Sequence, residues 1–329
     1  MAVTSRSPAG KVDSGAARPR PEVSGLVPAA EMVAVEEVMH EALADDDATP
    51  ARDAARYHLS TGGRRLRARL ALASGKAWHA PAAHRIAAAA ACELLHNASL
   101  VHDDLSDGDR FRRGRATVWH REGRDIALCT GDLLLTAAFE VAGDIDESSA
   151  SQTLLRQLAR HTRRVIGGQS LELAAQRDAA APSVRDYERA TRAKTAPLLE
   201  LPLTTGCMLG GVAVAQARIL SPLAEAIGLA YQIADDLDDT AGILTEGQGC
   251  ALHPFHALRH HRPPGEKTRT TADATRRRCL LHARAALARG KRLARQLPEP
   301  LRSELLLVMR ELADKLTAQE RADWTGTGA

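Results

Sequence analysis

Long apolar stretches rich in alanine and leucine constrain the fold of this chain more than any other feature. The stretch from Ala82 to Leu105 contains the run AHRIAAAAACELLHNASLVHDDL and has few breakers. Alanine and leucine favour helices, and alanine is a poor strand former. Aromatic residues make up only 3% of the chain, so the core has to consist mainly of Leu, Ala, Val and Ile. No apolar–polar alternation lasts long enough to indicate a sheet. The sequence therefore predicts an all-α protein.

The same helical pattern recurs along the chain from about residue 31. Further helices are predicted at Asp125–Val141, Ser151–Gln176, Tyr187–Leu201, Leu223–Leu237, Arg276–Leu297 and Leu301–Leu316. Loops are predicted at Gly108 and Arg112–Gly114, and an irregular segment at Thr240–Thr271. Pro197 and Pro202 should interrupt or kink a helix, whereas Ser221 and Pro222 are typical of a helix start. We expect residues 1–30 to form a flexible tail and residues 31–329 to form one large helical bundle domain.

Composition excludes several classes of protein. The net charge of +3, from 44 basic and 41 acidic residues, is too balanced to indicate a nucleic-acid partner. The five cysteines form no CxxC pair, which argues against a disulfide framework or a zinc site and fits a reducing cytoplasm. The N-terminal region lacks the apolar segment of a signal peptide. No stretch reaches the roughly 20 apolar residues of a membrane span.

Two acidic segments end apolar helices and share one spacing. Asp103, Asp104 and Asp107 form the first, and Asp235, Asp236, Asp238 and Asp239 belong to the second. Carboxylates four residues apart lie on one face of a helix and repel each other unless a cation intervenes. Oxygen ligands of this kind suit Mg²⁺, which commonly also binds substrate phosphates. A single such segment is equally well explained as a solvated helix end, but the repeated pattern favours a site that binds metal and diphosphate.

Cationic side chains near these segments supply what a diphosphate requires. Arg64 and Arg67 follow a Gly62–Gly63 turn and are three residues apart, so both can fork onto phosphate oxygens. His96 precedes Asp103 by about two helical turns and so lies on a similar face. The other candidates are Arg112, Arg113 and Lys194. Lys194 is expected in the middle of a helix among apolar neighbours, where an unpaired charge would be costly. The run Arg276–Arg278 is interpreted as a solvated face.

The motifs together resemble those of the trans-isoprenyl diphosphate synthases, the polyprenyl synthetase family. They are GGRRLR at 62–67, ELLHNASLVHDDLSDGDRFRRGRAT at 93–117, GD at 131–132, GQSLEL at 168–173, KT at 194–195 and YQIADDLDD at 231–239. Their order also fits, and the resemblance extends from about residue 35 to 240. Within this family, the sequence resembles the geranylgeranyl diphosphate synthases in particular. The resemblance implies an all-α fold around a central cavity, a cytoplasmic homodimer and three Mg²⁺ ions.

The resemblance also implies a reaction and a role for each matching residue. Isopentenyl diphosphate would condense head-to-tail with an allylic diphosphate (dimethylallyl, geranyl or farnesyl) in isoprenoid biosynthesis. The implied Mg²⁺ ligands are Asp103, Asp107 and Asp235, supported by Asp104, Asp236 and Asp239. The implied ligands of the allylic diphosphate are Arg112, Lys194 and Gln232. Those of isopentenyl diphosphate are Arg64, Arg67, His96 and Arg113. Thr195 and Gln169 would face the developing carbocation, which an apolar cavity would protect from water.

Product length in this family depends on residues just before the first acidic segment. Here the places five and four residues before Asp103 hold Ala98 and Ser99, which are both small, and the next turns hold Leu95 and Cys92. Nothing aromatic blocks a C15 chain there. We therefore expect a product of C20 or longer, with geranylgeranyl diphosphate favoured.

The segment after Asp239 departs from the family pattern. Gln248 stands where the resemblance leads us to expect a lysine, and Lys267–Thr268 is a loose substitute for a later element. Losing a cation there should weaken allylic diphosphate binding by roughly 1–3 kcal/mol. His253, His256, His260 and His261 cluster nearby, and a solvated histidine-rich loop explains them better than a metal site does.

Two alternatives remain open at this point. A class I terpene cyclase on the same scaffold would ionise an allylic diphosphate without needing Arg64, Arg67, His96 and Arg113. A non-catalytic regulatory subunit of a heteromeric synthase would not need Asp103, Asp107 and Asp235. The presence of both residue sets argues for the synthase.

Overall fold

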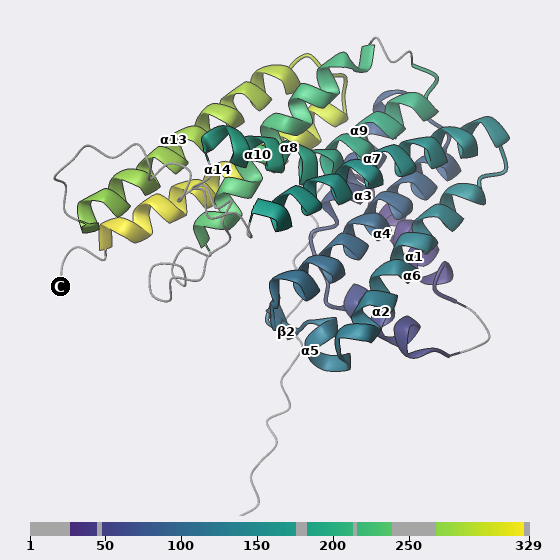
Figure 1. Ribbon diagram of the computed structural model, residues 1–329. Helices are drawn as coiled ribbons and strands as arrows, with labels where there is room; N and C mark the ends of the chain where they lie inside the picture. The colour runs from purple at the N-terminus through teal and green to yellow at the C-terminus, as the bar shows by residue number, and fades with distance from the viewer. Residues whose placement is uncertain (1–26, 45–47, 176–182, 213–215, 239–267, 326–329) are drawn as a thin grey trace, which may run out of the picture.

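The computed structural model describes residues 27–44, 48–175, 183–212, 216–238 and 268–325, which are almost entirely helical (Figure 1). The longer helices are α1 (Ala29–Glu41), α2 (Pro50–Ser60), α3 (Leu66–Ala77), α4 (Ala82–Asp107), α6 (Arg124–Gly143), α7 (Ser148–Ala175), α8 (Val184–Lys194), α9 (Ala196–Leu209), α10 (Leu220–Asp238), α13 (Thr268–Ala294) and α14 (Leu301–Thr325). Short elements are α5 (Val118–Glu122) and the 3-10 turn η1 (Gln216–Ile219). The predicted all-α fold is confirmed.

A two-stranded hairpin follows α4, where the sequence predicts only a loop. Strands β1 (Phe111–Arg112) and β2 (Arg115–Ala116) pair antiparallel. The two residues between them, Arg113 and Gly114, have positive φ angles of 53° and 75°. Two consecutive positive φ values are typical of the tight turn whose twist matches that of a hairpin. The hairpin directs the side chains of Arg112 and Arg113 toward different partners, as described below.

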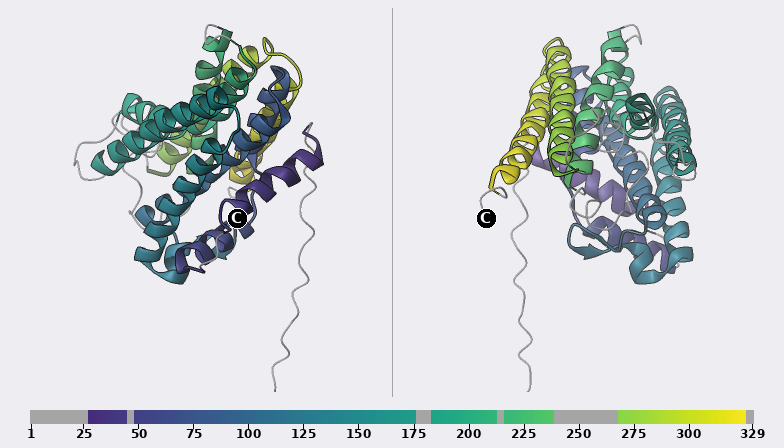
Figure 2. Two further views of the ribbon diagram at one scale, coloured as in Figure 1. Left: turned by 90° about the vertical axis from the view of Figure 1, so that its right-hand side faces the viewer. Right: turned by 60° about the vertical axis from the view of Figure 1, so that its left-hand side comes forward.

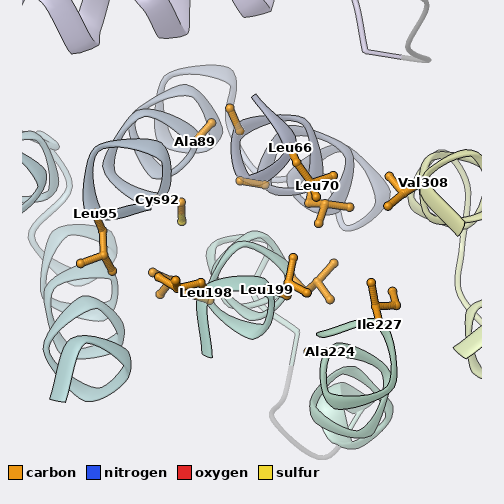
Figure 3. Packing of buried hydrophobic residues seen from close by; sticks show 14 of the residues in the cluster. Leu66, Leu70, Ala89, Cys92, Leu95, Leu198, Leu199, Ala224, Ile227 and Val308 are labelled. Atoms are coloured by element: carbon orange, nitrogen blue, oxygen red, sulfur yellow. The ribbon is translucent and has the colours of Figure 1, made fainter. Parts of the chain in front are cut away.

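The core lies where α3, α4, α9 and α10 meet, with α14 against α3 and α10 (Figures 2 and 3). Figure 3 shows Leu70, Cys92, Leu199 and Ile227 converging from these four helices, and each is at most 2% exposed. Four consecutive alanines of α4, residues 88–91, are fully buried. Their small side chains let neighbouring helices approach α4 closely, which explains why a chain so poor in aromatic residues still forms a dense core.

Helix boundaries differ from the prediction mainly around Thr195. The predicted helix at Tyr187–Leu201 is two helices, α8 and α9, which meet at Thr195. Pro197 lies in the first turn of α9, where its missing N–H costs nothing. Pro202 lies inside α9 without ending it. Helix α13 begins at Thr268, so the last four residues of the predicted irregular segment are helical.

Several predicted features fall outside the described residues. They are most of the N-terminal tail, Asp239, Gln248, the four histidines from His253 to His261 and Lys267. Of the five cysteines, Cys92, Cys129, Cys207 and Cys279 carry free thiols, and Cys250 lies outside the description.

Helix α6 has the length and composition of a membrane span, although the sequence leads us to expect none. It has 20 residues, and 44% of its apolar window is buried inside the protein. It packs against α4 and α2, as a core helix of a bundle does.

A buried ion pair fastens α14 to α3. The Arg69 Nε donates to the Glu304 Oε1 at 2.7 Å, and the two residues are 5% and 0% exposed. Because a charge buried without its partner is costly, this pair fixes how α14 lies against the bundle. Its position matters because α14 also reaches the candidate site.

Candidate functional site

The first acidic segment occupies the last turns of α4, which ends at Gly108 in a left-handed conformation with φ 75°. Asp103 and Asp107 are one turn apart, as the sequence predicts. Desolvation raises the pKa of Asp103, although Lys194 opposes the shift. Desolvation together with Asp103 and Glu172 raises the pKa of Asp107 to about 6. The α4 end is therefore a site where two carboxylates compete for positive charge.

Lys194 supplies part of that charge. Its Nζ lies 2.8 Å from the Glu172 Oε2 and 3.5 Å from the Asp103 Oδ1. Burial alone would lower its pKa, but Asp103 and Glu172 raise it above the ordinary lysine value. The expectation that Lys194 lies mid-helix is wrong, because it ends α8, which frees its side chain to cross toward α4. Glu172, within the GQSLEL motif, was not singled out from the sequence.

Close approach of α7 to α8 requires a glycine in the same motif. A Cβ on Gly168 would lie 2.4 Å from the backbone nitrogen of Lys194. Any larger residue would push Glu172 and Lys194 apart. The neighbouring Gln169 is half-buried, and neither its amide oxygen nor its nitrogen finds a partner among the described residues. An unpartnered buried amide is available to a ligand.

Arg112 binds a carboxylate in this structure. Its Nε donates to the Asp104 Oδ1 at 2.7 Å, and its Nη2 lies 2.6 Å from the same oxygen. Asp104 is 1% exposed, and desolvation raises its pKa against the opposing effect of Arg112. Asp104 therefore positions Arg112 and the hairpin.

The second acidic segment ends α10 and is held by a hydrogen-bond chain. The Tyr187 hydroxyl donates to the Asp236 Oδ2 at 2.7 Å, and the Gln232 Nε2 donates to the Asp236 Oδ1 at 2.9 Å. The Thr195 hydroxyl donates to the Gln232 Oε1 at 2.8 Å. Burial raises the pKa of Asp236 to about 7, although the hydrogen bonds from Tyr187 and Gln232 act to lower it. The structure thus brings together Thr195, Gln232 and Asp236 and adds Tyr187.

Asp235 faces a lysine from the end of the chain. The Lys315 Nζ on α14 lies 2.5 Å from the Asp235 Oδ1 and 2.7 Å from the Asp238 Oδ2. No motif of the sequence singled out Lys315, which is 80 residues from Asp235.

The two acidic segments face a shared space. Glu172 interacts electrostatically with Asp103 and Asp107 on one side and with Asp236 on the other. Across residues 27–44, 48–175, 183–212, 216–238 and 268–325, no three His, Cys, Asp or Glu side chains cluster tightly enough to enclose a metal ion alone. Carboxylates brought near each other from two helix ends fit a cation that shares its ligands with a phosphate substrate.

The predicted basic group lies beside this space. The Arg64 Nη2 donates to the Tyr231 hydroxyl at 2.9 Å, and its Nη1 lies 3.2 Å from Glu311. Arg67 is buried, and its Nε has no partner among the described residues. The Glu93 carboxylate accepts from the Ala68 N–H at 3.1 Å and so holds the first turn of α3, which carries Arg67.

His96 and Arg113 complete the basic group. Burial and then Arg67 and Arg113 hold the pKa of His96 well below its usual range, and its Nδ1 is unpartnered among the described atoms. Arg113 donates to the carbonyl of Gly62, which links the hairpin to the glycine turn. Buried His58 contacts this group as well: burial, Arg113 and Arg112 lower its pKa to about 3. His58 was not predicted.

Ala98 and Ser99 lie where the sequence places them, on α4 above the core. Ala98 is 2% exposed, and the half-buried Ser99 donates its hydroxyl to the His96 carbonyl at 2.7 Å. Below them Cys92 and Leu95 point toward Leu198 of α9 (Figure 3). An apolar chain that ran from Asp103 past Ser99, Ala98, Leu95 and Cys92 would therefore meet small or aliphatic side chains at these positions of α4.

The raised pKa of Asp236 predicts a pH dependence of folding in the metal-free protein. Folded Asp236 keeps its proton up to about pH 7, whereas an unfolded aspartate loses it near pH ~3.9. Between these values the folded state binds more protons, so the free energy of unfolding falls as pH rises. Asp236→Asn should flatten this slope, by on the order of 1.4 kcal/mol per unit of pKa difference. Urea denaturation with a chelator at about pH 5 and about pH 8 measures it; equal slopes would contradict the shift.

Known proteins share the sequence motifs that build this site. The chain matches the sequence profile described as "Polyprenyl synthetase" over residues 49–247, which is more than half of its length. It is 33% identical to a farnesyl diphosphate synthase from Geobacillus stearothermophilus over 56% of this chain and 65% of that protein. It is 34% identical to a chloroplastic geranylgeranyl pyrophosphate synthase from Capsicum annuum over 63% of this chain and 58% of that protein. The matches thus span less than two thirds of either relative.

Solved structures share the fold over almost the whole chain. A decaprenyl diphosphate synthase from Rhodobacter capsulatus superimposes with a TM-score of 0.75 at 24% identity, covering 88% of this chain and 97% of that one. A polyprenyl synthase from Caulobacter crescentus, complexed with calcium and isoprenyl diphosphate, gives a TM-score of 0.71 at 26% identity, covering 87% and 94%.

Proposed function

Because the chain belongs to the polyprenyl synthetase family, we propose that it is a prenyltransferase that joins isopentenyl diphosphate head-to-tail to an allylic diphosphate. The observation that carries the proposal is the pair of acidic helix ends around one space, with a separate basic group beside it. One acidic region with its cations accounts for one diphosphate, and the Arg64, Arg67, His96 and Arg113 group accounts for a second. Two diphosphate sites are what a condensation needs.

Mg²⁺ fits the donor set, and we propose three ions as the family resemblance implies. Asp103 and Asp107 would bind from α4, and Asp235 from α10. Each is a hard oxygen ligand, and burial raises the pKa of Asp103 and Asp107, a destabilisation of the ionised form that a bound cation would offset. Bound there, magnesium would neutralise the diphosphate as it leaves. The Caulobacter relative's complex with calcium and isoprenyl diphosphate supports a divalent cation in such a site.

The protein's own side chains then act on charge and water. Lys194 holds positive charge at the diphosphate end through Asp103 and Glu172. The Thr195 hydroxyl donates a hydrogen bond to the Gln232 Oε1, so its oxygen lone pairs remain available to a developing carbocation. The amide of Gln169, which has no partner among the described residues, is also available to a ligand. Apolar residues of α4 and α9 exclude water that would quench the cation. The departing diphosphate is the proposed base for the final proton.

One incubation tests the proposal. The protein is mixed with Mg²⁺, isopentenyl diphosphate and either dimethylallyl, geranyl or farnesyl diphosphate, and the products are separated by chromatography. A longer prenyl diphosphate is the expected product. A hydrocarbon or alcohol formed without isopentenyl diphosphate would instead show a cyclase. Turnover only with an added synthase subunit would show a regulatory subunit.

For product length, we propose C20 or longer, with geranylgeranyl diphosphate favoured. The support is the small lining at Ala98 and Ser99 and the aliphatic side chains below them. The relatives named above include both a farnesyl and a geranylgeranyl synthase, so length rests on this lining alone. Farnesyl diphosphate as sole end product would contradict it.

Ala98→Phe should shorten the main product by at least one five-carbon unit, because an aromatic ring would fill the space on α4 nearest Asp103. Leu95→Ala should lengthen it. Ala83→Phe, exposed at the start of the same helix, is the matched control and should leave the distribution unchanged. Product chromatography with thermal unfolding of each variant measures this. An unchanged distribution in folded Ala98→Phe would remove α4 as the wall that limits growth.

We also propose that the protein is a cytoplasmic homodimer. Exposed Leu128 on α6, at 51% exposure, is an apolar contact available to a second copy. Light scattering coupled to size-exclusion chromatography gives the mass directly, and a monomer at micromolar concentration would contradict the dimer.

A further inference from the structure

The last helix contributes two side chains to the rim of the candidate site. Glu311 and Lys315 are four residues apart on α14, so they lie on one face. Glu311 pairs with Arg64, and Lys315 pairs with Asp235 and Asp238. Each partner belongs to a residue set described above: Arg64 to the basic group and Asp235 to the second acidic segment. Helix α14 thus touches both halves of the site.

Lys315 is placed where a ligand can reach it. The side chains of Lys315, Asp235 and Asp238 are 33%, 45% and 51% exposed. Lys315 lines a hollow together with Arg64, Tyr231 and Glu311. The hollow therefore carries three cations: Lys315 on α14, Arg64 just before α3, and Arg69 on α3, which is paired with Glu304. The buried Arg69–Glu304 pair already fastens α14, so the partly exposed Lys315 is not needed for that purpose.

The two carboxylates that pair with Lys315 differ in their proposed roles toward metal. Asp235 is the proposed metal ligand of the segment, whereas Asp238 is not assigned to metal. Once a cation binds Asp235, the ammonium group loses one partner and keeps the other. A lysine ends in a compact charge on a flexible stem, so it can turn toward a new anion within a few ångströms. A metal-bound diphosphate brings that anion.

We propose that Lys315 has two alternative partners. In the free protein it neutralises Asp235, and once a metal ion binds Asp235 in its place, the ammonium group contacts the diphosphate. Asp238 tethers the ammonium group throughout. The inference rests on the proposed function, since it assigns Lys315 to the diphosphate site of that function. It makes Lys315 a diphosphate-binding residue contributed by a helix outside every motif of the sequence.

The affinities for Mg²⁺ and for inorganic diphosphate test this role, because we expect them to change in opposite directions. In Lys315→Gln the free protein should bind Mg²⁺ several-fold more tightly, because Asp235 is no longer occupied by a competing cation. At saturating Mg²⁺ the same variant should bind inorganic diphosphate about 10-fold more weakly, because a charge-assisted contact is lost. Isothermal titration calorimetry measures both without turnover.

Two further variants separate the role from folding and from net charge. Lys315→Arg keeps the charge and should retain most of the diphosphate affinity. Arg310→Gln removes one positive charge from an exposed position of the same helix and should change neither affinity. Thermal unfolding confirms that each variant is folded. Unchanged diphosphate affinity in folded Lys315→Gln, or weaker binding of both Mg²⁺ and diphosphate, would overturn the proposal.

The outcome is distinguishable from failure of the proposed function. If the wild-type protein forms longer prenyl diphosphates but Lys315→Gln binds diphosphate as tightly as wild type, only the role of Lys315 fails. If wild type binds diphosphate with the expected dependence on Lys315 but never condenses the two substrates, only the condensation fails.

Discussion

Asp103→Asn should lower the kcat/KM of condensation by about 10²- to 10³-fold, the loss typical when one group that stabilises transition-state charge is removed. Asparagine keeps the shape of the side chain but has no charge to bind a cation. Lys194 retains Glu172 at 2.8 Å, so its own position should persist. Steady-state kinetics with both diphosphates and varied Mg²⁺ measure the effect.

Asp103→Asn should not lower the stability of the protein, although it should lower its activity. The pKa of Asp103 is raised by burial, which means that the folded protein pays to keep this carboxylate ionised. Neutralising it should leave the melting temperature unchanged or higher. Asp314→Asn, an exposed carboxylate on α14, is the matched control and should leave kinetics unchanged. A folded Asp103→Asn variant with kcat/KM within a few-fold of wild type would remove Asp103 from the catalytic site.

Glu304→Ala should lower the free energy of unfolding by about 3–5 kcal/mol, the usual cost of removing one partner of a buried ion pair. The variant leaves Arg69, which is 5% exposed, without the carboxylate that accepts from its Nε. Chemical denaturation measures the change. Because α14 also carries Glu311 and Lys315, the variant should weaken diphosphate binding as well.

An exposed ion pair that also involves α14 provides the comparison for the buried pair. Arg284 and Glu320 join α13 to α14 at the surface, where solvent screens the interaction, so Glu320→Ala should change stability little. The double variant Arg69→Met with Glu304→Leu should recover most of the loss, since apolar residues of similar size often replace a buried pair. A loss no larger for Glu304→Ala than for Glu320→Ala would show that the pair does not anchor α14.

Local sequence patterns predicted the helices and the acidic ends well, because both depend on neighbours along the chain. Apolar periodicity located α4 and α10, and the four-residue spacing placed Asp103 beside Asp107. The interruption expected from Pro197 occurs, since α8 ends just before Thr195 and Pro197 lies in the first turn of α9. Pro202, expected to act in the same way, lies inside α9 without ending it, because its local pattern does not show how α9 packs.

Residues contributed by distant elements could not be predicted in this way. Glu172 and Lys315 act through contacts across helices, and periodicity specifies a face without specifying which helix covers it. His58 was missed for a similar reason: its partners come from the hairpin and from α4. The one available signal was charge, since two crowded acidic segments require cations, and a search for unassigned lysines on predicted helix faces would have included Lys315.

The pitch of α4 has a consequence for the set of products. One turn of an α-helix advances about 5.4 Å, and four carbon–carbon bonds of about 1.5 Å in a zigzag reach a similar distance. The main chain of an isoprenoid unit contains four such bonds per repeat. The helix and the growing chain are therefore nearly commensurate, so moving a bulky residue by one turn, from Ala98 to Leu95 to Cys92, should change the product in whole units. A graded series of variants could be built on this one helix without altering the acidic end, where the proposed function places the chemistry.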